Sequence, residues 1–251
     1  MALERQVHRL ALSLVVALVV AATTAAPAAA WPPPEAPSCE ILPVDNVWRA
    51  DISQMPVAPQ SPQWLANMGG PARRLHPDFG GPPYGYPITY VGRTTPRTAV
   101  SFDYQDESDP GPYPFTAQTA IEPASDRHAF MIDRDACILY ELFDAEWNGG
   151  TPRAGSGAIF DLRSNALRPA TWTSADAAGL PIFPGLVRYD EVFGRGLVDH
   201  AIRFTASRTD RSFVWPARHE AGAARDPSLP PMGARFRLRA DFDITRYSPH
   251  V

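Results

Sequence analysis

The sequence predicts an all-β fold, a single-domain β-sandwich or jelly roll with a few short helical turns. The chain holds 28 Pro and 17 Gly among 251 residues, and both residue types interrupt long helices. Short apolar runs rich in β-branched and aromatic residues recur between turn signals after residue 86. No long stretch has the apolar period of an amphipathic helix. This combination is typical of sandwiches and barrels.

Residues 1–30 have the pattern of a secretory signal peptide. Arg5 and Arg9 precede the apolar run 10–20, and small residues end the segment at 28–30. An uncleaved N-terminal anchor is the alternative, because the run lengthens if the Ala tract is added to it. The sequence therefore predicts a secreted, extracytoplasmic protein with no stable membrane span once the signal is cleaved. A Pro-rich leader, 31–38, precedes a single β-rich domain over 39–251.

Local signals place the elements in order. Ser61 suits a helix N-cap, Pro62 the first helical position and Gly69 the exit, which predicts a short helix over 61–70. The Gly/Pro-rich stretch 75–86 indicates an ordered loop. Residues 133–136 resemble a hairpin turn between two strands. We expect strands over 88–91, 99–102, 128–132, 137–143, 157–162, 201–205 and 212–215.

The segment 235–244 has the clearest strand pattern. Apolar side chains alternate with charged ones over its whole length, so each kind lies on its own face. Residues 173–179 predict one further helical turn. Ser248 and Pro249 are typical of a helix start, which leaves open a chain that continues beyond residue 251.

The charge composition excludes several classes of protein. Acidic residues number 27 and basic residues 23, for a net charge of −4, and every basic residue is Arg. Without Lys, a Schiff-base enzyme, a pyridoxal-phosphate enzyme and a Walker-type phosphate loop are ruled out. The acidic balance also argues against a nucleic-acid partner. Arg favours planar recognition of carboxylates, so an acidic ligand remains open.

Two cysteines, Cys39 and Cys137, suggest one disulfide in an exported protein. The bond would close a loop of about 100 residues and stabilise the fold by roughly 4–5 kcal/mol. Two free thiols or a metal pair are the alternative. The spacing matches no zinc motif.

Seven segments together resemble a family of secreted bacterial proteins of unassigned activity. The resemblance covers residue 39 to about residue 248 and implies no reaction. It also implies a continuation into a helix and an apolar segment beyond the Ser-Pro pair, where this sequence stops. The segments are 106–114 (DESDPGPYP), 126–128, 154–162, 172–181 (WTSADAAGLP), 200–205 (HAIRFT), 214–219 (VWPARH) and 230–238 (PPMGARFRL).

Three histidines lie beside charged residues. On the expected strand, His200 shares a face with the apolar residues 202 and 204, as a packed core histidine or as a base in a concave face, while Arg203 points away. Arg218 and His219 follow a Pro at a strand exit, where a functional loop or a solvated one is expected.

The third histidine, His128, follows Asp126 by two residues. Such spacing resembles a carboxylate–histidine relay, although residues two apart on a strand share a face without necessarily bonding.

The loop 103–109 concentrates carboxylates. A Ca²⁺ site at Asp106, Glu107 and Asp109, a catalytic acid pair, and a solvated turn are the three readings. Ser156 does not lie in a nucleophile elbow, because position 154 is Ala rather than Gly.

These residues favour a secreted enzyme acting on a polysaccharide as hydrolase or lyase. Elimination from a uronic acid sugar would use His200, His219, Arg203, Arg218 and Tyr189. Hydrolysis would use two carboxylates among Asp106, Glu107, Asp126 and Asp176. Stacking on a sugar is expected at Trp172, Trp215 and Tyr113. A non-catalytic carbohydrate-binding or cell-surface module and a structural exported protein are the alternatives.

Overall fold

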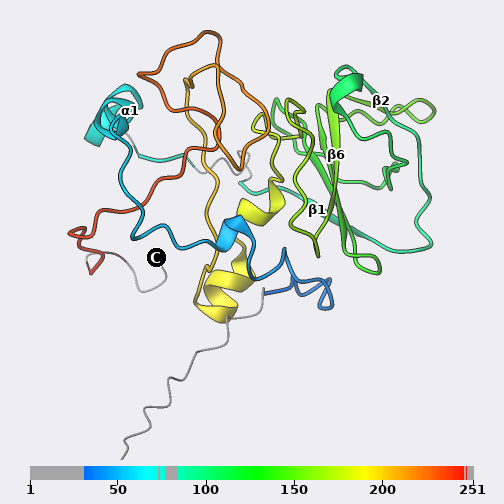
Figure 1. The fold of residues 1–251 in the computed structure, drawn as a ribbon. Helices are drawn as coiled ribbons and strands as arrows, with labels where there is room; N and C mark the ends of the chain where they lie inside the picture. The colour runs from blue at the N-terminus through cyan, green and yellow to red at the C-terminus, as the bar shows by residue number, and fades with distance from the viewer. Residues whose placement is uncertain (1–30, 73, 77–83, 246, 248–251) are drawn as a thin grey trace, which may run out of the picture.

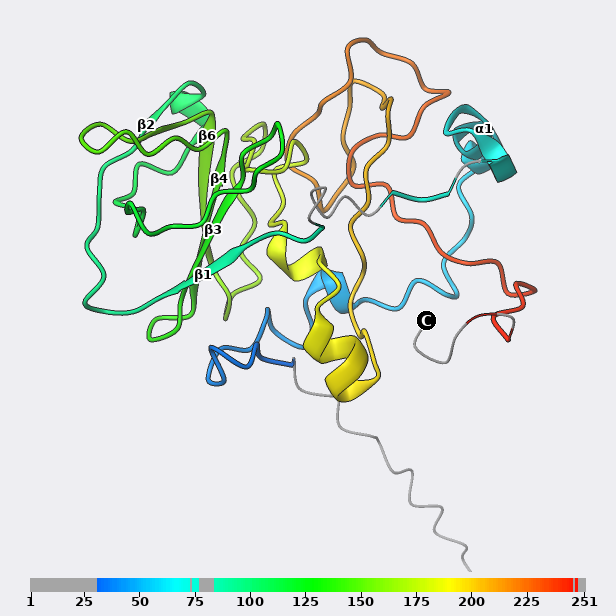
Figure 2. The same cartoon turned by 180° about the vertical axis from the view of Figure 1, so that it is seen from behind.

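The computed structural model describes residues 31–72, 74–76, 84–245 and 247. A strand-rich half and a largely irregular half lie side by side (Figures 1 and 2). The strand-rich half holds the sheet drawn in green, whereas the irregular half contains most of the C-terminal third and the short helix α1. The candidate site lies where these two halves meet.

A four-stranded mixed sheet forms the centre of the strand-rich half, in the order β1-β3-β4-β6. Strand β1 pairs parallel with β3, whereas β3–β4 and β4–β6 are antiparallel. In the hairpin register, Met131 lies opposite Tyr140. The strands are β1 (Ile88–Val91), β3 (Ala129–Asp133), β4 (Ile138–Phe143) and β6 (Ser156–Asp161).

The remaining elements are short. Strands β2 (Ser101–Phe102) and β5 (Arg153–Ala154) form a parallel pair. The helix α1 covers Ser61–Asn67 and has Pro62 in its first turn. A π-helical segment, η5, covers Asp190–Arg195 and ends at Gly196 with φ +71°. The 3₁₀ turns are η1 (Val47–Arg49), η2 (Gly70–Ala72), η3 (Gln105–Glu107) and η4 (Phe183–Gly185).

Both faces of the sheet are covered. All five residues of β3 are buried, which explains why its first four residues, 129–132, form a continuous apolar run rather than an alternating pattern. Phe130 and Ile132 pack into one apolar cluster, and Ala129 and Met131 into the cluster on the other face. Burial on both faces makes this sheet a rigid support for the loops that leave its ends.

The predicted disulfide is confirmed. Cys39 and Cys137 are bonded across 98 positions of sequence. The bond ties the N-terminal segment to the β3–β4 turn, just before β4 begins at Ile138. Buried Ile41 and Leu42 then pack into the same apolar cluster as both cysteines.

Several expected elements agree with the structure. The predicted short helix is present as Ser61–Asn67, although Gln60 rather than Ser61 is its N-cap. The strands at 88–91, 128–132, 137–143 and 157–162 appear within one or two residues of their expected bounds. The expected strand at 99–102 shortens to Ser101–Phe102. The mainly-β class is confirmed, whereas the sandwich or jelly-roll arrangement stays a prediction.

The expected strands at 201–205, 212–215 and 235–244 are wrong. Within the described residues these segments make only the single bridges Thr205–His76 and Phe213–Met232. A strand needs a neighbour in register over several residues. The first two segments have one bridge each, and 235–244 has none among the described residues. The helical turn expected at 173–179 is also wrong, since these residues form bends and turns.

No described helix is long and apolar enough to cross a membrane. The predicted signal peptide and the Ser-Pro pair at 248–249 lie outside the described residues, as does most of the loop expected at 75–86.

Candidate active site

A cavity of about 1270 Å³ lies between the two halves of the molecule. Phe143 at the end of β4 and Ser156 at the start of β6 contribute to one side. The segments 198–209, 219–224 and 229–238 contribute to the other. Ligand sites for drug-sized molecules take roughly 300–1,000 Å³, so this cavity accommodates a larger ligand.

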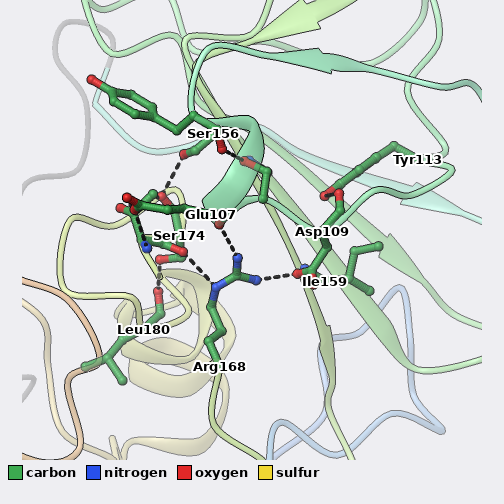
Figure 3. Close-up of polar contacts among 12 residues, drawn as sticks. Glu107, Asp109, Tyr113, Ser156, Ile159, Arg168, Ser174 and Leu180 are labelled. Atoms are coloured by element: carbon green, nitrogen blue, oxygen red, sulfur yellow. Dashed lines mark hydrogen bonds and ion pairs between the residues drawn. The ribbon is translucent and has the colours of Figure 1, made fainter. Parts of the chain in front are cut away.

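The loop 173–179 forms the polar floor of the cavity. The Ser174 hydroxyl lies 2.6 Å from the Leu180 carbonyl and 2.9 Å from the Asp176 amide. The Ser156 hydroxyl donates to the Ser174 carbonyl at 2.7 Å, which joins the loop to β6 (Figure 3). Gly179 adopts φ +68°, and a Cβ there would lie 2.5 Å from the Trp172 carbonyl. The loop therefore requires glycine at its exit.

Glu107 projects over this floor from η3. Its Oε2 accepts the Thr173 backbone N–H at 3.1 Å and lies 3.6 Å from Nε2 of His219. The Glu107 side chain is 35% exposed and that of His219 is 26% exposed. Both groups are therefore held by the protein and still open to the cavity.

The hydrogen bond that His219 makes through Nδ1 determines which of its ring nitrogens carries the proton in the neutral ring. His219 Nδ1 lies 2.9 Å from the Ala177 carbonyl oxygen, which can only accept a hydrogen bond. Nδ1 therefore carries the proton, and in the neutral ring the lone pair is on Nε2, facing Glu107. General acid–base catalysis needs a group that donates a proton and a group that accepts one. Glu107 and His219 Nε2 can fill these two roles.

Arg168 ties the two loops of the site together. Its Nη2 donates to the Glu107 carbonyl at 2.8 Å, its Nε to the Thr173 carbonyl at 2.7 Å, and its Nη1 pairs with the Asp109 carboxylate (Figure 3). Asp109 in turn accepts the Ile159 backbone N–H of β6 at 2.9 Å. The guanidinium side chain is only 3% exposed. Its rigid fork of donors fixes the position of Glu107 relative to loop 173–179.

An ion pair adds charge to the same cavity. Asp176 Oδ2 lies 3.6 Å from Arg203 Nε, and the two side chains are 15% and 11% exposed. Asp126 also lines the cavity, with Oδ1 accepting the Ser125 hydroxyl at 3.2 Å. These three residues were all sequence candidates, and the structure brings them to one cavity with Glu107 and His219.

His128 supports the floor from below. Its Nδ1 lies 2.7 Å from Glu122 Oε2 and its Nε2 lies 3.2 Å from the Ala175 carbonyl. Burial opposes charge on the ring, but the hydrogen bond and the charge of Glu122 prevail and raise the pKa of His128. Burial likewise acts against ionisation of Glu122, yet its bonds from His128 lower its pKa. The predicted relay with Asp126 is replaced by this buried pair with Glu122.

Glu141 makes a second support on β4. The residue is fully buried, and its carboxylate accepts the backbone N–H groups of Ile182 at 3.0 Å and Phe183 at 2.9 Å. Burial raises the pKa of Glu141 to about 7, and these two donors offset part of that rise. His128 and Glu141 thus hold both ends of the 175–183 segment on the sheet.

His200 belongs to the cavity wall but its side chain is packed, and Tyr189 lies outside that wall. His200 Nε2 lies 3.2 Å from Glu191, which also pairs with Arg188 at 3.2 Å, and the His200 side chain is only 4% exposed. Tyr189 is 78% exposed and stacks on Phe193 at 4.7 Å, outside the cavity wall. His200 is therefore a packed histidine whose Nε2 bonds Glu191, as one of its two sequence interpretations proposed.

The predicted sugar-stacking rings do not gather at the cavity. Tyr113 is fully buried and donates its hydroxyl to the Asp109 carbonyl at 2.8 Å. The Arg168 guanidinium lies 5.5 Å from the Trp172 ring, and that of Arg235 lies 5.9 Å from the Trp215 ring. These three rings lie outside the cavity wall of the described chain.

The remaining candidates serve the loops. Arg218 Nε donates to the Arg168 carbonyl at 2.8 Å. Asp106 is exposed on η3, whereas Asp109 turns inward to Arg168, so the proposed Ca²⁺ ligands diverge from Glu107. Within the described ranges, no three His, Cys, Asp or Glu side chains are grouped to hold a metal ion.

Three contributors were not predicted from the sequence. Arg168 and Glu122 act through contacts 61 and 6 positions away, respectively, and no local pattern marks them. Tyr104 lines the cavity three residues before Glu107 and is 54% exposed. Its position in the carboxylate-rich loop was the available signal, because an exposed ring beside an acid suits a sugar face.

Comparison of the chain with protein-family models, with curated proteins and with solved structures finds no match.

Proposed function

We propose that this protein is an extracytoplasmic enzyme that acts on a polysaccharide by general acid–base catalysis, with Glu107 and His219 as its proton-transferring pair. The proposal rests on the distance of 3.6 Å between Glu107 Oε2 and His219 Nε2 at a large cavity. A hydrogen bond to the backbone holds each of these side chains. An acid–base centre needs groups within reach of one another and oriented by partners. A binding module or a structural protein has no need for such a pair.

The separation of the pair favours elimination over hydrolysis. Hydrolysis with inversion needs an acid and a base roughly 6.5–9.5 Å apart, to leave room for the attacking water, and the Glu107 and His219 atoms are 3.6 Å apart. In elimination, His219 Nε2 takes the proton next to the sugar carboxylate, the bond to the leaving oxygen breaks, and Glu107 protonates that oxygen. Arg203 lines the same cavity, and a uronate carboxylate would compete with Asp176 for its guanidinium.

The cavity also has a face for a sugar ring. Tyr104 is 54% exposed beside Glu107, and an aromatic ring offers an apolar surface that matches the C–H face of a pyranose. Truncation of Tyr104 to Ala would therefore weaken substrate binding more than it slows proton transfer, and KM would rise several-fold while kcat changes little.

The test is a screen of the oxidised protein against neutral and uronate polysaccharides, with measurement of both new reducing ends and unsaturated-uronate absorbance. Reducing ends alone indicate hydrolysis, and both signals indicate elimination. Glu107→Gln and His219→Gln should each reduce turnover at least about 100-fold. Glu146→Gln, an exposed carboxylate paired with Arg153, is the matched control and should keep full activity. Retention on a glycan column without any product would favour the binding module instead.

A further inference from the structure

The segment 235–244 exposes an apolar row, to which the described part of the chain contributes the stacking of Tyr247 on Phe242 at 5.8 Å. Leu238 is 64% exposed, Phe242 44% and Ile244 61%. Large apolar side chains at regular spacing in one segment are uncommon on a free surface and mark an interaction site. Within the described residues the segment belongs to no strand and makes no bridge.

Only its N-terminal end is anchored to the body of the protein. Phe236 packs edge-on against Phe204 at 5.3 Å, and Arg237 donates to the Ile52 carbonyl. Beyond that point the chain bends in a turn closed by one backbone hydrogen bond, from the Phe242 N–H to the Arg239 carbonyl at 3.0 Å, and by the exposed ion pair of Arg239 with Asp241. This ion pair would exchange partners in a dimer, from Asp241 of the same copy to Asp241 of the other. An exposed turn with one backbone bond opens easily when an extended partner is offered.

The charge order of the segment is self-complementary. When two copies run antiparallel with Ala240 opposite itself, Arg237 of one faces Asp243 of the other. In the same register Arg239 faces Asp241. Cross-strand pairs of opposite charge stabilise such a ladder, and like charges destabilise it. We infer that a second copy of this chain pairs along 235–244, antiparallel and centred on Ala240.

The apolar face agrees with the same register. Phe236 lies opposite Ile244, and Leu238 lies opposite Phe242, so each copy covers the row that the other exposes. Aromatic and aliphatic pairs across a strand add to the stability of the ladder. Since strand faces alternate, a shift by one residue would place apolar side chains against charged ones.

Neighbouring registers are worse. Centring the pair on Arg239 sets that cation against its own copy, and centring it on Asp241 does the same for an anion, with a like-charge penalty in each case. A parallel arrangement in register would set every Arg against Arg. The sequence therefore favours one geometry, and that geometry closes as a two-fold dimer rather than as a fibre.

Charge exchange tests the inference. The double variant Arg237→Asp with Arg239→Asp makes all four paired positions, 237, 239, 241 and 243, acidic, and Asp241→Arg with Asp243→Arg makes them all basic. Sedimentation velocity of the oxidised chain 31–251 should show dimers for the wild type with rising concentration and monomers for each double variant alone. An equimolar mixture of the two variants should restore a dimer. The reversal of an exposed charge elsewhere, Arg163→Asp, should leave the wild-type dimer intact.

A second variant fixes the register. Residues directly opposite in antiparallel strands have Cα atoms about 4.5–5.5 Å apart, within the range of a disulfide. Ala240→Cys should therefore form a covalent dimer under mild oxidation, whereas Thr245→Cys should not. A monomeric wild type at all concentrations would overturn the inference, as would a mixture of charge variants that stays monomeric. These two overturning results are the ones expected if a different protein, rather than a second copy, covers the segment.

Discussion

Replacement of Arg168 by Ala tests the architecture of the site most severely. The change leaves the Glu107 and Thr173 carbonyls without their donor and Asp109 without its cation. Loss of one partner from a buried ion pair costs about 3–5 kcal/mol, and this side chain is 3% exposed. For a chain of this size, about 2–4 °C is lost per kcal/mol. We therefore expect a fall in Tm of roughly 6–20 °C.

The assay is thermal denaturation with the disulfide intact, and the comparison is Arg163→Ala. Arg163 also pairs with an aspartate, Asp161 at 3.2 Å, but its side chain is 59% exposed, so that variant should lose no more than about 1 kcal/mol. Arg168→Lys keeps the charge but not the planar fork and should lie between the two. Equal midpoints for Arg168→Ala and Arg163→Ala would refute the view that this guanidinium builds the site.

Three further outcomes follow from the buried groups. Burial raises the pKa of Glu141 to about 7, so the folded state binds more protons than the unfolded state. The free energy of unfolding should therefore fall by about 3 kcal/mol between pH 4.5 and 7. Thermal scans of Glu141→Gln should show a smaller dependence on pH. The raised pKa of His128 adds stability below pH 6.5 that is lost as pH rises through the folded value, a loss that His128→Gln should remove. Replacing Cys39 and Cys137 by Ala should cost about 4–5 kcal/mol in urea; an unchanged midpoint would contradict this.

Local sequence patterns predicted the strands of the sheet well because the sheet is built from neighbours. The β3–β4 hairpin joins contiguous apolar runs through a four-residue turn. Both strands lie in the core, where the apolar residues that favour strands are also the ones that pack well. Cys39 and Cys137 were paired by count and compartment alone, and the structure agrees.

The C-terminal third shows where such patterns fail. The alternation at 235–244 describes a strand that lacks a described neighbour, and alternation alone does not supply one. The site depends on contacts across long separations: Arg168 reaches Glu107 across 61 positions, and His219 reaches Ala177 across 42. Residue types identified Glu107 and His219 as candidates, but only the fold shows that they meet.

The account rests on proton transfer between Glu107 and His219, and turnover of a cleaved glycan measures it directly. Glu107→Gln, His219→Gln and the double variant would be compared with the wild type on the polysaccharide that the screen identifies. Groups that act as one unit give non-additive losses, so the double variant should be no slower than the slower single variant. Full activity in either single variant, or losses that multiply in the double variant, would contradict the account.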